Sequence, residues 1–428
     1  MKKLILVFVS LTTGLLSLTQ GGSARQTEIR EAGDNLVISL VTMGPGPLVW
    51  ERFGHNAISV RDTVAGTDRW YNYGLFSFAQ EDFILKFVQG RMLYWMDDTS
   101  ATQTVAAYAQ AGRSVWVQEL NLTSRQRSDL KRFLEWNDSD ENRLYRYDYY
   151  WDNCSTRVRD AIDGVLGGVM QEQTEDLIVE HTFRSHTERL TTNNAPIYTG
   201  LMLGLGPMVD EPLSAWDEMF LPLAMRERVR EITLVREDGE SVPLVKSEMT
   251  LFESDMWPVD DAPPKWHAWY AILGLLIAAL LFSAAKYHAR SPLHGRLAAS
   301  GMFVWMFVVG IFGVGLFSLW AFTDHAVSYR NENLFLFNPL WFFMALLLIP
   351  AAFDVAWAIR AIRWLALASF GVMVVGFVGQ IFPGLDQKNA QMFELVLLPN
   401  LVALYAVIER FGGGVPALAK VLFDRTAD

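Results

Sequence analysis

The chain has 428 residues but only one cysteine, Cys154. A single cysteine excludes an internal disulfide, so the fold has to be held together by its hydrophobic core. The chain also lacks a stripe of basic residues, and its net charge of -11 argues against a nucleic-acid partner. Residues 1–24 contain no cysteine either, which argues against a lipid-anchored protein.

The amino-terminal segment combines two lysines with an apolar run to about Leu18 and small residues ending at Ala24. This pattern predicts a secretory signal peptide, with an amino-terminal membrane anchor as the alternative. Further along, a proline- and acid-rich stretch separates a mixed region from a largely apolar one. We therefore divide the chain into a signal peptide (1–24), an exported domain (25–258), a linker (259–267) and a membrane domain (268–428).

Five apolar runs in the membrane domain are each close to the length that crosses about 30 Å of hydrocarbon: 269–285, 301–322, 334–352, 362–381 and 393–408. If the preceding domain is outside, the two outer loops carry only Arg330 and Lys388 as basic residues. The inner loops and tail then carry Lys286, Arg290, Arg296, Arg360, Arg363, Arg410, Lys420 and Arg425. This excess of inner positive charge agrees with the signal peptide. We predict a multi-pass membrane protein with its amino-terminal domain on the outer side of the membrane.

The exported domain mixes strand and helix patterns. Residues 35–44, 55–62, 70–73 and 112–123 are typical of strands, and a helix is predicted to begin at Thr123 or Ser124. Apolar residues from Val158 to Leu166 have helical spacing and are followed by Gly167. Residues 230–245 predict a hairpin around an Asp-Gly turn. Together these patterns favour an α+β fold with an antiparallel sheet.

Cys154 lies where a cysteine nucleophile would be expected. It follows Asp152 and Asn153, which are both good helix caps, and precedes the helical pattern. In the first turn of a helix, unpaired backbone amides and the helix dipole lower the pKa of a thiol. An inert, buried cysteine is the alternative on this local pattern.

A nucleophilic cysteine also needs a base. His55 follows Gly54 at the start of a predicted strand, where the ring can project from the strand end. A hydrogen-bonded structural histidine is the alternative. His181 and His186 are predicted to lie on an exposed or half-exposed helix.

Several blocks of the sequence resemble the Lnb family of bacterial lipoprotein N-acyltransferases. "RFGHNAISVRD" (52–62), "WYNYGLFSF" (70–78), "YRYDYYWDNCSTRVRDAID" (145–163), "HTFRS" (181–185) and "MFLPLAM" (219–225) are similar to successive motifs of that family's exported domain. "TDHAVSYRNENLFLFNPL" (323–340) is similar to its membrane part. The resemblance extends over most of the mature chain.

The resemblance implies a cysteine-hydrolase-like fold similar to a permuted papain or NlpC/P60 domain. Cys154 is then the nucleophile and His55 the base. A third group is expected to orient the imidazole. Asn72 is our choice for that role, with Asp62 as the weaker candidate. Asn153, or the backbone amide of Cys154, is expected to stabilise an oxyanion.

The implied reaction moves an acyl chain from a phospholipid, through a thioester on Cys154, to the α-amine of a diacylglyceryl-cysteine at the start of a lipoprotein. Because amines attack thioesters readily, we expect no cofactor and no bound metal ion. A membrane-tethered cysteine hydrolase acting on cell-wall peptide or lipid ester would use the same residues. A non-enzymatic exported module is a further alternative.

Polar residues near the outer ends of the apolar runs suggest a second part of the site. They are His325, Asn331, Asn333, Asn338, Gln380 and Glu394. Ordinary polar loop residues are one interpretation. A floor that meets the exported domain and a lipid head group is the other. On the second interpretation we assign substrate binding to His325, Asn331 and Asn333, together with Glu51 and Arg52. The aromatic run of Tyr145, Tyr147, Tyr149, Tyr150 and Trp151 either shields a thioester from water or packs in the core.

Overall fold

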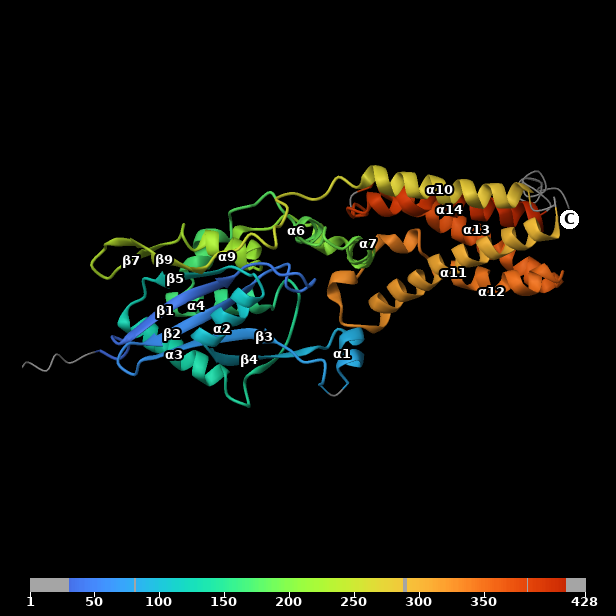
Figure 1. Ribbon diagram of the computed structural model, residues 1–428. Coiled ribbons are helices and arrows are strands. Elements are labelled where there is room, and N and C mark those ends of the chain that lie inside the picture. Colours follow the sequence, from blue (N-terminus) through green and yellow to red (C-terminus); the bar gives the residue numbers. More distant parts are fainter. Residues whose placement is uncertain (1–30, 81, 288–290, 383, 413–428) are drawn as a thin grey trace, which may run out of the picture.

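The computed structural model describes residues 31–80, 82–287, 291–382 and 384–412. The predicted signal peptide and residues 413–428 of the predicted cytoplasmic tail lie outside this part of the chain. Figure 1 shows two regions: an α/β domain and an elongated bundle of long helices. Two helices, α6 (Phe183–Leu190) and α7 (Ala195–Gly204), lie between these regions.

A seven-stranded sheet forms the centre of the amino-terminal domain, in the order β6-β4-β3-β2-β1-β5-β9. Its strands are β1 (Leu36–Met43), β2 (His55–Asp62), β3 (Thr67–Leu75), β4 (Leu93–Ser100), β5 (Val115–Leu120), β6 (Leu144–Arg146) and β9 (Val245–Phe252). Neighbouring strands are antiparallel throughout. The predicted mixture of helices with an antiparallel sheet is therefore confirmed.

Helices cover both faces of this sheet. On one face lie α3 (Ser124–Asn137) and α4 (Cys154–Leu166), packed on side chains such as Ile38, Leu40 and Ile58. On the other face lies α2 (Ala101–Gln110), beside Val41 and Trp70. The alternation along β1 follows from the two-residue period of a strand, which sends successive side chains to opposite faces. It fixes which residues of β2 and β3 lie on each side of the sheet.

Shorter elements complete this domain. They are α1 (Phe83–Gln89), α5 (Val169–Thr174), the 3-10 helix η1 (Pro207–Asp210), α8 (Ala215–Glu218), α9 (Pro222–Arg228), β7 (Thr233–Val235) and β8 (Ser241–Pro243). The predicted hairpin is confirmed by β7 and β8, with Gly239 in the left-handed region at φ 84°. The chain then continues directly into β9, which the sequence analysis misses.

The helical bundle consists of α10 (His267–Tyr287), α11 (Pro292–Phe322), α12 (Leu340–Ala352), α13 (Ala356–Gly379) and α14 (Ala390–Gly412). The predicted five apolar runs are confirmed, because five helical segments within the described residues are long and apolar enough to cross a membrane. The third run differs from the prediction in one respect. It opens with a 3-10 turn (Glu332–Phe335), and the regular helix begins only at Leu340, after Pro339.

Candidate active site

Cys154 is the first residue of α4, as its flanking residues predict. The side chain of Asn153 caps the helix, accepting hydrogen bonds from the backbone amides of Ser155 at 2.8 Å and Thr156 at 3.0 Å. The same asparagine donates to the carbonyls of Tyr149 at 3.0 Å and Phe220 at 3.1 Å. Cys154 itself is half-buried. The cap therefore fixes where the helix starts and holds the thiol at that point.

The pKa of the Cys154 thiol differs in direction from the prediction. Burial raises it to about 11, against hydrogen bonds from the backbone amides of Asn56, Cys154 and Ser155 and the positive charge of Arg113. The expectation of a lowered pKa is wrong because burial removes more solvation from the thiolate than the amides return. Near neutral pH the Cys154 side chain is therefore a protonated thiol, which would need a base in order to act as a nucleophile.

A buried hydrogen bond ties the start of α4 to the start of β2. Asn56 donates from Nδ2 to Oγ of Ser155 at 2.9 Å, and this hydroxyl donates to the carbonyl of Met219 at 2.6 Å. Asn56 follows His55 directly, and its backbone amide also acts on the Cys154 thiol. The histidine segment and the cysteine helix thus meet although 99 residues separate the two ends of that bond.

His55 lies beside Asn72, as predicted. Its Nε2 is 3.3 Å from Oδ1 of Asn72. The amide nitrogen of Asn72 donates to the carbonyl of Trp70 at 2.8 Å and to Oγ1 of Thr99 at 2.9 Å. These two bonds turn the oxygen of Asn72 toward the ring, so Nε2 of His55 carries the proton and Nδ1 keeps its lone pair.

The electrostatics keep this imidazole neutral. Burial lowers the pKa of His55 to about 4, helped by the charge of Arg113 and opposed by the hydrogen bond that Asn72 accepts from the ring. Near neutral pH the ring therefore has an unprotonated nitrogen available as a base. The described geometry offers a neutral thiol and a neutral imidazole rather than an ion pair.

Arg113 is a residue of this site that the sequence analysis misses. It is buried, with Nε donating to the carbonyl of Gly44 at 2.9 Å and Nη1 lying 3.3 Å from Oε1 of Glu51. Its guanidinium lies 4.6 Å from the ring centre of Tyr108. The available signal was a charged residue at the edge of the apolar strand "RSVWV". Its charge favours a thiolate at Cys154 and disfavours a proton on His55.

Gly74 is a second missed residue. Its φ of 84° lies in the left-handed region, and a Cβ built there would be 3.2 Å from Cβ of Cys154 and 3.4 Å from the Tyr147 ring. The register between β3 and β4 shifts in this stretch, between Asn72 and Leu75. The glycine in "WYNYG" therefore permits β3 to pass close to the cysteine.

Three predictions about neighbouring residues need correction. Asp62 lies at the opposite end of β2 from His55, where it accepts from the amides of Val64 and Ala65, so it does not orient the imidazole. Asn153 uses both amide hydrogens on backbone carbonyls and has none left for an oxyanion. His186 is buried rather than half-exposed, with Nε2 at 3.2 Å from Oε1 of Glu218.

The residues assigned to substrate binding make contacts within the protein. Arg52 is buried and donates to the carbonyls of Leu190 at 2.9 Å and Pro258 at 2.7 Å. Glu51 accepts from the amide of Leu48 at 3.1 Å and pairs with Arg113. These two side chains brace the loop before His55.

The outer loops of the bundle meet the amino-terminal domain, which confirms that half of the floor prediction. Asn331 donates to the carbonyls of Leu203 at 2.8 Å and Gly204 at 2.9 Å, and Asn333 reaches those of Met202 and Leu203. The imidazole of His325 lies 2.8 Å from the carbonyl of Phe87 and stacks on Tyr149. Contact with a lipid head group stays a prediction.

The remaining floor residues bond within the bundle. Asn338 pairs with Ser369, Gln380 donates to Glu332 at 2.6 Å, and Glu394 pairs with His267 at 3.0 Å.

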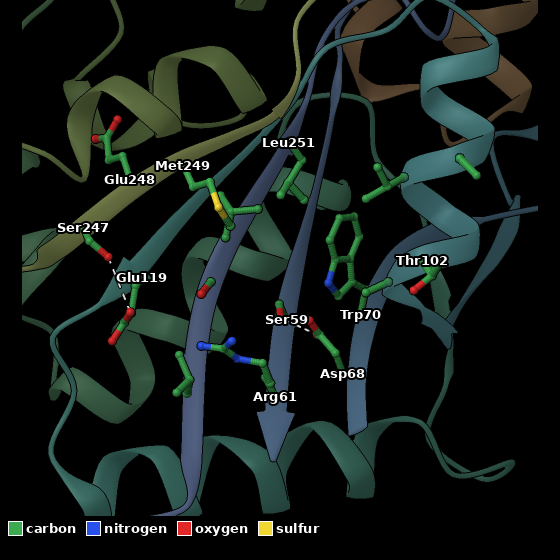
Figure 2. A pocket seen from close by; sticks show the side chains of 16 residues that line it. Ser59, Arg61, Asp68, Trp70, Thr102, Glu119, Ser247, Glu248, Met249 and Leu251 are labelled. Carbon is green, nitrogen blue, oxygen red and sulfur yellow. Dashed lines mark hydrogen bonds between the residues drawn. The ribbon is translucent and has the colours of Figure 1, made fainter. Parts of the chain in front are cut away.

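A surface hollow of about 470 Å³ lies elsewhere, on the α2 face of the sheet. Figure 2 shows Arg61, Asp68 and Trp70 around it, with Ser59 bonded to Asp68. Cys154, His55 and Asn72 are not among the residues that line it. Three carboxylates, Asp97, Asp98 and Asp138, lie within 4.8 Å of one another, and nothing else in the described residues points to an ion there. Neither feature belongs to the cysteine site.

Comparison with known proteins finds a similarity for the amino-terminal part of the chain. Residues 29–189 match the family described as the Lnb N-terminal periplasmic domain. No curated protein and no solved structure matches the chain. The matched segment contains the capped Cys154, His55 and Asn72. Residues 29–189 are therefore similar to an Lnb N-terminal periplasmic domain, and in the described residues that follow them five helices are long and apolar enough to cross a membrane.

Proposed function

We propose that this protein is a lipoprotein N-acyltransferase of the inner membrane, in which Cys154 carries the acyl chain and His55 moves its proton. The family match supports an enzyme related to Lnb-type lipoprotein N-acyltransferases. The observation that carries the finer proposal is the joint between α4 and β2: the capped Cys154 lies beside the backbone amide of Asn56, next to the oriented pair His55 and Asn72. We keep the predicted division into a periplasmic domain (25–258), a linker (259–267) and a membrane domain (268–428), and the likeness to a permuted papain-type fold, as parts of this proposal.

In the first half-reaction the phospholipid ester is broken. Nδ1 of His55 takes the proton of the Cys154 thiol as the sulfur attacks the ester carbonyl, and the new S–C bond gives a tetrahedral oxyanion. The intermediate collapses with cleavage of the C–O bond. The leaving glycerol oxygen receives the proton from His55, which yields a lysophospholipid and an acyl thioester on Cys154.

Backbone amides are the proposed oxyanion donors. The amides of Cys154 and Asn56 both act on the sulfur, so they lie where negative charge develops next to it. The amide of Ser155 is already bonded to Asn153. Arg113 adds a buried positive charge that favours the anionic intermediate.

In the second half-reaction the lipoprotein amine accepts the chain. The neutral α-amine of the diacylglyceryl-cysteine attacks the thioester carbonyl and loses a proton to His55. The C–S bond then breaks, an amide is formed, and the cysteine sulfur takes back the proton. The atoms balance without a cofactor, a metal ion or ATP.

The experiment is mass spectrometry of the purified full-length protein after incubation with phospholipid, followed by addition of a diacylated lipopeptide. We expect an acyl mass on the peptide containing Cys154, which disappears as N-acylated lipopeptide forms. Cys154→Ala should carry no thioester, and His181→Ala serves as a matched histidine control that keeps the reaction.

The hydrolase alternative predicts other products. Release of free fatty acid or cut peptide, with no N-acylated lipopeptide, would replace transfer by hydrolysis at the same cysteine. If Cys154→Ala and His55→Ala both keep full activity, the cysteine is not the nucleophile and the proposal fails.

A further inference from the structure

The helix α1 exposes apolar side chains that its own domain does not cover. Ile84, Leu85 and Val88 are 68%, 55% and 54% exposed, and Phe78, just before the helix, is 64% exposed. Only Phe83 of the helix is buried. Exposing a large apolar side chain to water is unfavourable, so a cluster of them on and just before a seven-residue helix indicates a contact surface. We call α1 together with Phe76 and Phe78 the aromatic arm.

The aromatic arm is attached to the membrane part of the chain. The amide of Asp324 donates to the carbonyl of Gln89 at 2.8 Å, and His325 lies 2.8 Å from the carbonyl of Phe87. Gly90 permits this approach, because a Cβ there would be 2.8 Å from the backbone of Asp324. Figure 1 shows α1 next to the end of α11 from which this loop emerges.

That end of α11 fixes the level of the arm relative to a bilayer. Trp320 and Phe322 are 46% and 73% exposed in the last turn of a helix long enough to span hydrocarbon. A tryptophan at the end of such a helix is typical of the membrane–water boundary. Because α1 is hydrogen-bonded to the residues that follow α11, its exposed apolar side chains lie at this same end of the helix.

Aromatic rings connect the arm to the active site. The ring of Phe83 stacks on Phe76 at 6.0 Å, Phe76 lies 5.1 Å from Tyr94, and Tyr94 stacks on Tyr147 at 4.1 Å. Tyr147 in turn borders the close approach of Gly74 to Cys154. A continuous row of packed aromatic rings therefore connects the exposed helix with the surroundings of the thiol.

From these contacts we infer that the aromatic arm lies in the outer leaflet of the membrane and guides an acyl chain of a membrane lipid along these rings to Cys154. The position of the arm stands on its own contacts. The guiding role rests on the proposed function, since it needs an acyl donor at Cys154. The occupant of the surface is the lipid itself, drawn from the bilayer that surrounds α11.

The position is tested by fluorescence quenching in the full-length protein. A bimane label is attached to Leu85→Cys or to Val64→Cys in the Cys154→Ser background, and the protein is placed in vesicles containing lipids brominated on their acyl chains. Val64 is the matched control, because it is 69% exposed in the turn before β3, at the other end of the strand from the arm. We expect at least about twofold stronger quenching at position 85 than at position 64. Equal quenching would overturn the inference, and would leave a protein partner as the occupant.

The guiding role is tested by comparing two acyl donors. With vesicle phospholipid as donor, Leu85→Asp should lower the rate of Cys154 acylation about tenfold. With a water-soluble short-chain ester as donor, the same substitution should lower that rate much less. Val64→Asp should change neither rate. If Leu85→Asp lowers the acylation rate equally with both donors, the aromatic arm does not guide the acyl chain. If wild-type protein is acylated by neither donor, the proposed function fails, whereas the quenching result still decides where the arm lies.

Discussion

Two sets of buried polar residues in this protein look alike in the sequence but differ in how their hydrogen bonds are used. At the interface between the amino-terminal domain and the helical bundle, Asn331 and Asn333 donate their amide hydrogens to backbone carbonyls of residues 202–204. At the cysteine site, His55 has one described partner, Asn72, and keeps a ring nitrogen for a proton. The asparagines, whose amide hydrogens are all bonded, hold the two regions together. The histidine, whose other ring nitrogen has no hydrogen-bond partner among the described residues, is available for proton transfer.

The largest expected effect is on the rate of Cys154 acylation and comes from removing the imidazole of His55. His55→Ala should lower the rate of Cys154 acylation by about 10²–10⁴-fold, the usual contribution of a positioned base. Asn72→Ala should cost less, about tenfold, because the ring loses only its orientation. Rates are measured by mass spectrometry of the acyl-enzyme, with melting temperature as the check on folding. An unchanged rate for His55→Ala would mean that His55 is as structural as Asn331 and Asn333.

The second effect is on stability as a function of pH. His55 has a pKa of about 4 in the folded protein, against 6.5 for the free side chain, so the unfolded chain binds more protons between these values. Stability from this group is therefore complete above about pH 6.5 and is lost as the pH falls toward 4, by about 3 kcal/mol. His55→Gln should show a smaller fall in melting temperature between pH 7 and pH 4.5 than wild type. Parallel curves would mean that burial does not hold this ring neutral.

Changes at the interface between the two regions should lower the stability of the protein rather than its acylation rate. Asn331→Ala removes the side-chain donor to the carbonyl of Gly204 and one of the two side-chain donors to the carbonyl of Leu203, at a cost of about 1–3 kcal/mol. We expect a lower melting temperature, with a Cys154 acylation rate that stays within about threefold for the molecules that remain folded. A large loss of rate at full stability would instead move Asn331 into the substrate site.

The smallest effect is expected where the two regions meet in solvent. Arg146 lies 3.5 Å from Asp324, and its side chain is 66% exposed. Because water screens such pairs, Arg146→Ala should leave the melting temperature unchanged within error. A clear drop would show that exposed charges, and not only saturated amides, fasten the two regions together.

Local pattern was sufficient for the elements that carry the chemistry. The cap of Asn153, the helical spacing after Cys154 and the strand after Gly54 were all readable, because capping and periodicity act within a few residues. The pairing of His55 with Asn72 was also anticipated from neighbouring strands.

What escaped the sequence depends on distant contacts. The raised pKa of Cys154 arises from burial by the surrounding fold, which no local pattern reports. Arg113 enters the site through its bonds to Gly44 and Glu51, far away in the chain. The strand β9 pairs with β5 across more than a hundred residues, and its exposed, charge-bearing sequence "VKSEMTLF" gave no strong strand signal.

The neutral state of Cys154 has a consequence for the life of the protein in an oxidising compartment. Oxidants attack thiolates, and a thiol whose pKa is raised to about 11 is almost entirely protonated near pH 7. A nucleophile that was ionised at rest would be exposed to peroxide and to stray disulfide exchange, with no second cysteine in the chain to rescue it. On the proposed mechanism Cys154 ionises only when His55 takes its proton during the attack, so burial protects the resting thiol from oxidation.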